Sequence, residues 1–185
     1  MANGNKEENN CSLPKVKAGD LVKIDFVASL RDGVIFDTSI GFEADNCGII
    51  DPDREYKPVE FIVGSNAVIK GLDDGLMGME FNESKTFVIS PNKAYGERDE
   101  SKLRDLPVEI IGEKREPIIG EYFILKDEKG QFVNCLIKEV KDGRILADTN
   151  HPLAGKEIVI TVKVLAINGK PAEKKSEEKN MGTYY

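Results

Sequence analysis

The fold is decided by a motif that is split into two halves. The first half is Ser90-Pro91-Asn92-Lys93-Ala94-Tyr95-Gly96. The second half, Asn150-His151-Pro152-Leu153-Ala154-Gly155, follows much later in the chain. The block between them carries strand and turn signals of its own. This arrangement predicts one small β domain that is interrupted by a second. A single substrate would then meet two surfaces, one for chemistry and one for holding.

The composition of the chain limits the class of protein to which it can belong. The 185 residues fit one domain or two small ones, and the 40% of hydrophobic residues can build a core. No apolar run approaches the roughly 18 residues of a spanning helix, and Met1–Asn10 lacks the apolar stretch of a signal peptide. The net charge of −7 disfavours a nucleic-acid-binding surface. We therefore expect a cytoplasmic protein with neither a membrane nor a nucleic acid as partner.

The sequence also argues against several kinds of site. Three dispersed cysteines and the single His151 disfavour a disulfide framework and a zinc site, so we expect no metal and no cofactor. No G-x-S-x-G, P-loop or dinucleotide-binding glycine pattern appears. The acidic run 51–55 lacks the spacing of a calcium loop, which favours a solvated loop.

Strand patterns dominate on both sides of the interruption. Residues 21–28 alternate so that Val22, Ile24 and Phe26 share a face, and a turn at 31–33 leads to a returning strand at 34–36. Further strands are predicted at 59–63, 84–90 and 158–167. The longest of them places Ile158, Ile160, Val162, Val164 and Ala166 on one face.

One short helix fits between Ile69 and Met77, with Ile69, Leu72 and Leu76 on one side. Each interior glycine weakens it by about 1 kcal/mol, so it needs tertiary packing. The same glycines would let it lie close on a sheet.

The interrupting block predicts a separate β meander. Its expected strands are 121–126, 131–140 and 145–147, with turns at 127–130 and 141–144, and they follow a segment at 103–111 that contains Pro107 and two isoleucines. Both ends of the chain are polar and charged, which is typical of a disordered leader at 1–14 and a flexible tail at 170–185.

Five motifs in this order resemble the FKBP-type peptidyl-prolyl isomerases. They are D-G-x-x-F-D at 32–37, F-x-x-G at 61–64, V-I-x-G-L at 68–72, S-P-x-x-A-Y-G at 90–96 and N-H-P-L-A-G at 150–155. The insertion and the last motif resemble the SlyD-like branch, whose inserted domain replaces the flap tip. Leu72 stands where many members of the family have tryptophan, and Phe26 where tyrosine is usual.

The resemblance implies a mainly β (α+β) fold. A half-wrapped antiparallel sheet would carry one short helix across its concave face, with a small inserted antiparallel β domain beside it. The implied domains are the isomerase domain at 15–97 and 149–169 and the inserted domain at 98–148.

The resemblance implies a peptidyl-prolyl cis-trans isomerase that works without covalent chemistry, with chaperone activity from the inserted domain. Its partners would be unfolded or partly folded proline-containing polypeptides, and we expect a monomer. The implied catalytic and substrate-binding residues are Phe26, Phe36, Asp37, Phe61, Val68, Ile69, Leu72, Tyr95, Leu153 and Ile160. The expected chaperone surface is Ile110, Ile111, Tyr122, Phe123, Phe132 and Leu136.

Three polar groups are given roles. The N–H of Ile69 would hold a substrate carbonyl, and the Tyr95 hydroxyl would donate to the substrate. Asp37 would polarise the carbonyl or brace its neighbours, or else cap a turn after the hairpin.

Alternative functions stay open at this point. One is a non-catalytic holdase that keeps the fold but only binds unfolded chains, an alternative that Phe26 and Leu72 leave open. Another is a plain interaction module. The inserted block is alternatively a stabilising lid.

Overall fold

The computed structural model describes residues 14–112, 116–126 and 130–169. Almost all of the expected leader, the whole tail and most of the turn expected at 127–130 lie outside this description. The chain divides into two compact units, one formed by Met1–Ile89 with Ile158–Tyr185 and the other by Ser90–Glu157. We call them the first and the second unit. The second unit takes in the loop at 90–96 as well as residues 98–148.

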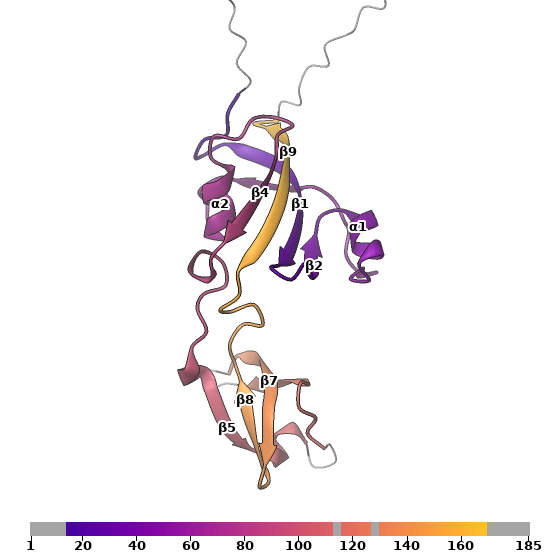
Figure 1. Ribbon diagram of the computed structural model, residues 1–185, viewed down its shortest axis with the longest axis vertical. Coiled ribbons are helices and arrows are strands. Elements are labelled where there is room, and N and C mark those ends of the chain that lie inside the picture. The colour runs from indigo at the N-terminus through magenta and orange to yellow at the C-terminus, as the bar shows by residue number, and fades with distance from the viewer. Residues whose placement is uncertain (1–13, 113–115, 127–129, 170–185) are drawn as a thin grey trace, which may run out of the picture. The chain divides into compact units, whose positions relative to one another are not determined.

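The first unit is built on a five-stranded antiparallel sheet (Figure 1). Its strands are β1 (Leu21–Leu30), β2 (Ile35–Thr38), β3 (Val59–Ile62), β4 (Ser84–Ile89) and β9 (Ile158–Ile167). The order is β2-β1-β9-β4, and β3 pairs with the first half of β1. The predicted mainly β fold is confirmed.

Helix α2 (Lys70–Leu76) packs against β4, as Figure 1 shows. A Cβ atom added at Gly75 would lie 2.9 Å from the Phe87 ring, and one at Gly71 would collide with Ile89. The helix therefore approaches the sheet more closely than any residue but glycine allows. This confirms the expectation drawn from its glycines.

The core face of the long strand β9 departs from the prediction near its end. Ile158 through Val164 alternate as expected, but Ala166 is only half-buried and Ile167 is buried in its place. The register against β1 slips at this point, from Ile24 opposite Val164 to Lys23 opposite Ala166. A β-bulge adds one residue and moves the side chains that follow to the other face.

A second helix, α1 (Gly41–Asn46), lies in the segment 38–57 (Figure 1), where no helix was predicted. Its single buried residue is Ala44. A six-residue helix shows too little of the helical period to be found from hydrophobic spacing.

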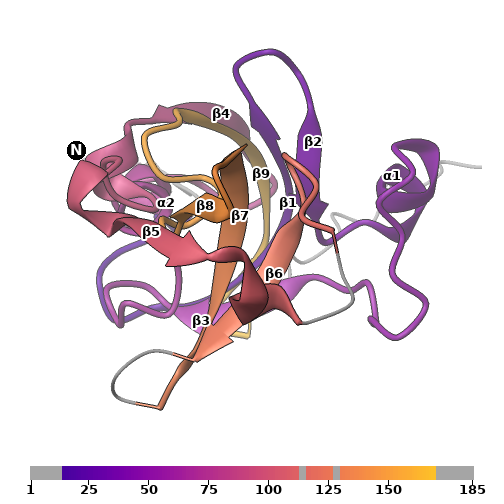
Figure 2. The same cartoon turned by 90° about the horizontal axis from the view of Figure 1, so that it is seen from below.

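The second unit is a four-stranded antiparallel sheet in the order β5-β8-β7-β6 (Figure 2). Its strands are β5 (Leu103–Pro107), β6 (Tyr122–Lys126), β7 (Phe132–Lys141) and β8 (Arg144–Asp148). The described residues of this unit also form the short 3-10 helices η1 (Pro91–Lys93), η2 (Glu100–Lys102) and η3 (Val108–Ile111). Strands β6 to β8 form the expected meander, and β5 pairs with the outer side of β8.

None of the helices in the described ranges has the length and apolar character needed to span a bilayer.

Candidate functional site

The strand register brings several predicted site residues of the first unit to one face of the sheet. Ala28 lies opposite Asp37 on β2 and opposite Ile160 on β9. Ile160 in turn lies opposite Phe87 on β4, the residue that Gly75 of α2 approaches. Residues directly opposite each other in antiparallel strands share a face. Asp37 and Ile160 therefore lie on the face that α2 covers.

Two aromatic residues belong to the same face. Phe26 precedes Ala28 by two residues on β1, and alternate residues of a strand point the same way. Phe61 on β3 lies opposite Val22, which also shares this alternation. The backbone of Phe26 is fixed because its N–H donates to Ser39 Oγ (2.9 Å) and its carbonyl accepts from Thr38 Oγ1 (2.8 Å).

Burial differs across this set of residues. Ile160, Leu72 and Phe61 are buried, with 4%, 5% and 7% of their surface exposed. The half-buried members are Phe26, Phe36, Val68 and Ile69. Solvent therefore reaches only some of the predicted site residues, and the others are part of the core.

Helix α2 begins beside this face without a side-chain cap. Ile69 is its N-cap residue, and no side chain in the described part of the chain bonds to the helix start. The preceding loop is tied to the helix by Asp73, whose buried carboxylate accepts the Gly64 N–H at 3.0 Å. The motif spacing does not single out Asp73, although an acid on the buried side of a helix is an unusual feature.

The carboxylate of Asp37 binds Arg54. The Nη1 atom of Arg54 lies 2.6 Å from Asp37 Oδ1, and its Nη2 atom donates to the Thr38 carbonyl at 3.2 Å. The hairpin turn is capped by Asp32, which accepts the Val34 N–H at 3.1 Å. The alternative of a turn-capping role for Asp37 after the hairpin stays a prediction. Sequence reasoning treated Arg54 as part of a solvated loop and missed it.

The two halves of the split motif meet within the second unit. The rings of Tyr95 and His151 stack with centroids 4.4 Å apart and an interplanar angle of 3°. The Gly155 N–H donates to the Gly96 carbonyl at 2.9 Å. Tyr95 is half-buried, as is Leu153, whose N–H donates to His151 Nδ1.

The motifs, the sheet and the glycine-lined helix agree with comparisons to known proteins. A family model described as FKBP-type peptidyl-prolyl cis-trans isomerase matches residues 13–111. The chain belongs to this family.

Its relatives include peptidyl-prolyl cis-trans isomerases with two kinds of name. A short-type peptidyl-prolyl cis-trans isomerase of Methanocaldococcus jannaschii is 38% identical over 159 residues, which are 85% of this chain and 96% of that protein. The SlyD protein of Helicobacter pylori is 31% identical over 127 residues, 66% of each chain. SlyD of Escherichia coli K12 is 29% identical over 64% of this chain and 60% of its own length. The SlyD-like character expected from the motifs is confirmed.

The base of the second unit in this FKBP-type isomerase is held by a buried polar network. Asn150 donates to the Asp99 carbonyl (2.9 Å) and to Asp148 Oδ1 (2.8 Å), and its own side-chain oxygen accepts the Asp99 N–H. Arg98 Nη1 lies 2.8 Å from Asp148 Oδ2. Burial works to raise the pKa of Asp148, but hydrogen bonds from Asn150 and the Arg98 charge outweigh it, and this pKa is lowered. The network joins the chain segment that enters the sheet to the one that leaves it.

The sheet of the second unit has an apolar outer face. Tyr122 lies opposite Leu136, and Lys126 opposite Phe132, so these residues share a face with Ile124 between them. Phe132 and Ile124 are 77% and 67% exposed. Ile124 was not predicted, although it is the alternate neighbour of Tyr122.

The other residues predicted for the chaperone surface do not lie together on the outer face. Phe123 lies on the opposite face, across from the buried Cys135, and is not part of the outer face. Ile110 is exposed and Ile111 half-buried in η3. Ile118 and Ile119, both exposed just before β6, were missed because no strand or helix period marks them.

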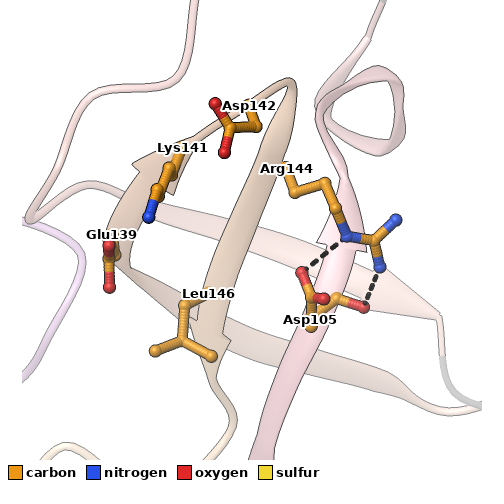
Figure 3. A pocket seen from close by; sticks show the side chains of 6 residues that line it. All are labelled: Asp105, Glu139, Lys141, Asp142, Arg144 and Leu146. Carbon is orange, nitrogen blue, oxygen red and sulfur yellow. Dashed lines mark hydrogen bonds and ion pairs between the residues drawn. The ribbon is translucent and has the colours of Figure 1, made fainter.

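A depression on the second unit has a different lining (Figure 3). It is lined by Asp105, Glu139, Lys141, Asp142, Arg144 and Leu146. Arg144 Nε lies 2.8 Å from Asp105 Oδ1 and its Nη2 donates to the Asp105 carbonyl, as the dashed lines show. This charged lining does not suit an apolar prolyl ring. Within the described ranges, no group of three His, Cys, Asp or Glu residues is arranged to hold a metal ion.

Proposed function

We propose that prolyl isomerisation takes place on the sheet face under α2. The residues proposed to contact the substrate are Phe26, Phe36, Asp37, Phe61, Val68, Ile69, Leu72 and Ile160, with Tyr95 and Leu153 from the split motif. The observation that carries this proposal is the register that gathers Phe26, Asp37, Phe61 and Ile160 on one face.

The chemistry explains why these residues are mostly apolar. Rotation about the X–Pro bond breaks amide conjugation against a barrier of about 18–20 kcal/mol, but no covalent bond forms or breaks. The reaction needs no acid, base or nucleophile. The twisted bond is less polar than the planar one, so an apolar surface favours the twisted state. Only this difference between transition state and ground state accelerates the reaction.

Two groups would orient the peptide. The backbone N–H groups at the start of α2 lack intrahelical acceptors, so the N–H of Ile69 can hold a substrate carbonyl. The Tyr95 hydroxyl can donate a second hydrogen bond, with its ring fixed by the stack on His151.

A matched pair of phenylalanine variants tests the location of the site. Phe36 is half-buried at the irregularity where β2 pairs with β1, whereas Phe42 on α1 is exposed and outside the proposed face. In a proline-limited tetrapeptide assay, Phe36→Ala should lower kcat/KM roughly tenfold, equivalent to about 1.4 kcal/mol of transition-state contact. Phe42→Ala should keep the parent rate. Equal rates for both variants would move the site away from this face.

We also propose that the second unit holds unfolded clients and supplies their prolines to the site. Its support is the outer face of β6 and β7, where Tyr122, Ile124 and Phe132 are exposed together. Large apolar side chains gathered on an exposed surface mark an interaction site. Tethering a client to the same chain raises its effective concentration at the site without any new contact there.

Anti-aggregation assays test the holding role separately from catalysis. The Ile124→Ser/Phe132→Ser double variant should protect an aggregating client less than the intact chain does. Val88→Ser, which removes an exposed apolar residue from β4 of the first unit, serves as the control and should protect fully. Undiminished protection by the double variant would favour the lid interpretation.

A further inference from the structure

The segment 38–57 connects β2 to β3 and returns one side chain to the proposed site. That side chain is Arg54, whose guanidinium spans two neighbouring residues of β2, the carboxylate of Asp37 and the carbonyl of Thr38. Thr38 is fully buried and its hydroxyl binds the Phe26 carbonyl. Arg54 is therefore joined to the strand pair that carries Phe26.

Arg54 is itself held in place by its own segment. Its guanidinium lies 5.1 Å from the centre of the Tyr56 ring. The Tyr56 hydroxyl accepts the Asp51 N–H (2.9 Å) and donates to the Ile49 carbonyl (3.2 Å). The Arg54 N–H donates to the Asp51 carbonyl, which closes a turn just ahead of the ring. These bonds limit the freedom of a side chain that would otherwise lose much entropy on pairing.

The same ring fixes the start of α1. A Cβ atom added at Gly41 would lie 3.3 Å from Tyr56 Cβ, so helix and ring pack tightly at this point. The helix, the turn at 51–54 and the ring together form a support for one guanidinium. This gives the segment a physical role that its sequence does not indicate.

The pairing changes what Asp37 can do near a peptide. An ionised carboxylate only accepts hydrogen bonds, so alone it would repel a substrate carbonyl oxygen. A guanidinium is planar, always charged, and fixes the orientation of a carboxylate that it binds. Paired with Arg54, Asp37 presents a carboxylate of fixed orientation, with a positive charge beside it, at the edge of the apolar face.

We infer that Arg54 is a positioning residue for the isomerase reaction, acting through Asp37, and that segment 38–57 serves to deliver it. The inference rests on the proposed function, in which Asp37 belongs to the site. The substrate contact is made by Asp37 and its neighbours, and Arg54 sets their geometry.

A double-mutant cycle on a proline-limited tetrapeptide tests this role. The variants are Arg54→Ala, Asp37→Ala and the two combined. Both partners are partly exposed, 41% for Arg54 and 36% for Asp37, so the pair is screened and Arg54→Ala should lower kcat/KM by about two- to fivefold. If Arg54 acts through Asp37, the combined variant should be no slower than Asp37→Ala alone.

Three further measurements separate positioning from support of the fold. Arg54→Lys keeps the charge but lacks the planar fork, and should recover part of the loss. Lys57→Ala removes a nearby cation that pairs with Glu55, and should leave the rate unchanged. Added salt should slow the intact chain toward the rate of Arg54→Ala, because it screens an exposed pair.

The outcomes separate this inference from the proposed function. A parent rate for Arg54→Ala, or multiplied losses in the combined variant, would overturn the role of Arg54 alone. A loss that vanishes after correction for the folded fraction, measured by thermal unfolding, would do the same. A parent rate for Asp37→Ala would remove Asp37 from the proposed site and the inference with it.

Discussion

Among single residues, the proposed site combines buried apolar side chains with a few fixed polar groups. Leu72 and Ile160 are buried, whereas solvent still reaches Phe26 and Phe36. The polar groups are held by neighbours rather than left mobile, Asp37 by Arg54 and the Tyr95 ring by His151. This arrangement suits a reaction that depends on geometry and on a dry contact more than on proton transfer.

The Tyr95 hydroxyl can be tested without disturbing the stack. Tyr95→Phe keeps the ring on His151 and removes one donor, so kcat/KM on a tetrapeptide should fall roughly two- to tenfold, the worth of one hydrogen bond. The kcat/KM of Tyr95→Ala should be lower still, because this variant also loses the ring stack on His151. A parent rate for Tyr95→Phe would show that the ring, and not the hydroxyl, is what the site uses.

The five motifs, taken in chain order, indicate many residues of the proposed site from the sequence alone. The five motifs indicate Phe36, Asp37, Phe61 and the start of α2, because each is a local pattern of neighbouring residues. Local motifs do not indicate Arg54, because its role depends on how the segment 38–57 folds back on β2. Phe123 shows the opposite error, since its aromatic type indicates an exposed surface whereas the register places it opposite buried Cys135.

At the scale of elements, the close contact between α2 and β4 is a strict packing requirement. Gly75→Ala would place a methyl group 2.9 Å from the Phe87 ring and should destabilise the protein by about 1–3 kcal/mol. Lys70→Ala on the exposed side of the same helix should change stability by less than about 0.5 kcal/mol. Urea unfolding curves of both variants measure the difference. Similar curves for the two variants would mean that the stability of the protein does not depend on the close packing of α2 against β4.

The polar network at the base of the second unit should respond to acid. Because the folded-state pKa of Asp148 is lowered, its stabilising contribution is fully present above the unfolded-state pKa of about 3.9 and is lost as the pH falls below it. Asp148→Asn should destabilise the unit at pH 7 and make its stability less dependent on pH between about 5 and 2.

Hydrogen exchange at the β8 amides measures this effect within the second unit. Asp105→Asn is the control, because Asp105 pairs with Arg144 at an exposed position. An unchanged pH dependence in Asp148→Asn would contradict the role given to the network.

Strands and helices differ in how well sequence predicts them here. Val22, Ile24 and Phe26 alternate with the polar Lys23 and Asp25, and burial alternates through residues 158–164, so these strands and their core faces follow from the pattern. The bulge before Ile167 adds one residue and has no signature in composition, so the face of Ala166 cannot be read from periodicity. Helix α1 is too short to show a period, and it is held by packing against Tyr56.

At the scale of the whole molecule, two compact units carry complementary surfaces. The first presents the covered face with the proposed isomerase site, and the second presents the exposed outer face of β6 and β7. Isomerases must release their product, so binding at the site itself is necessarily weak. A second surface on the same chain compensates for that weakness by raising the effective concentration of the client.

The most direct test of this account compares two substrates on the same proteins. Proline-limited refolding of an unfolded protein and isomerisation of a tetrapeptide are measured for the intact chain and for Ile124→Ser/Phe132→Ser. The double variant should be slower by about tenfold or more on the unfolded protein and should keep its rate on the tetrapeptide. Equal rates of intact chain and variant on the unfolded protein, or equal losses on both substrates, would contradict this account.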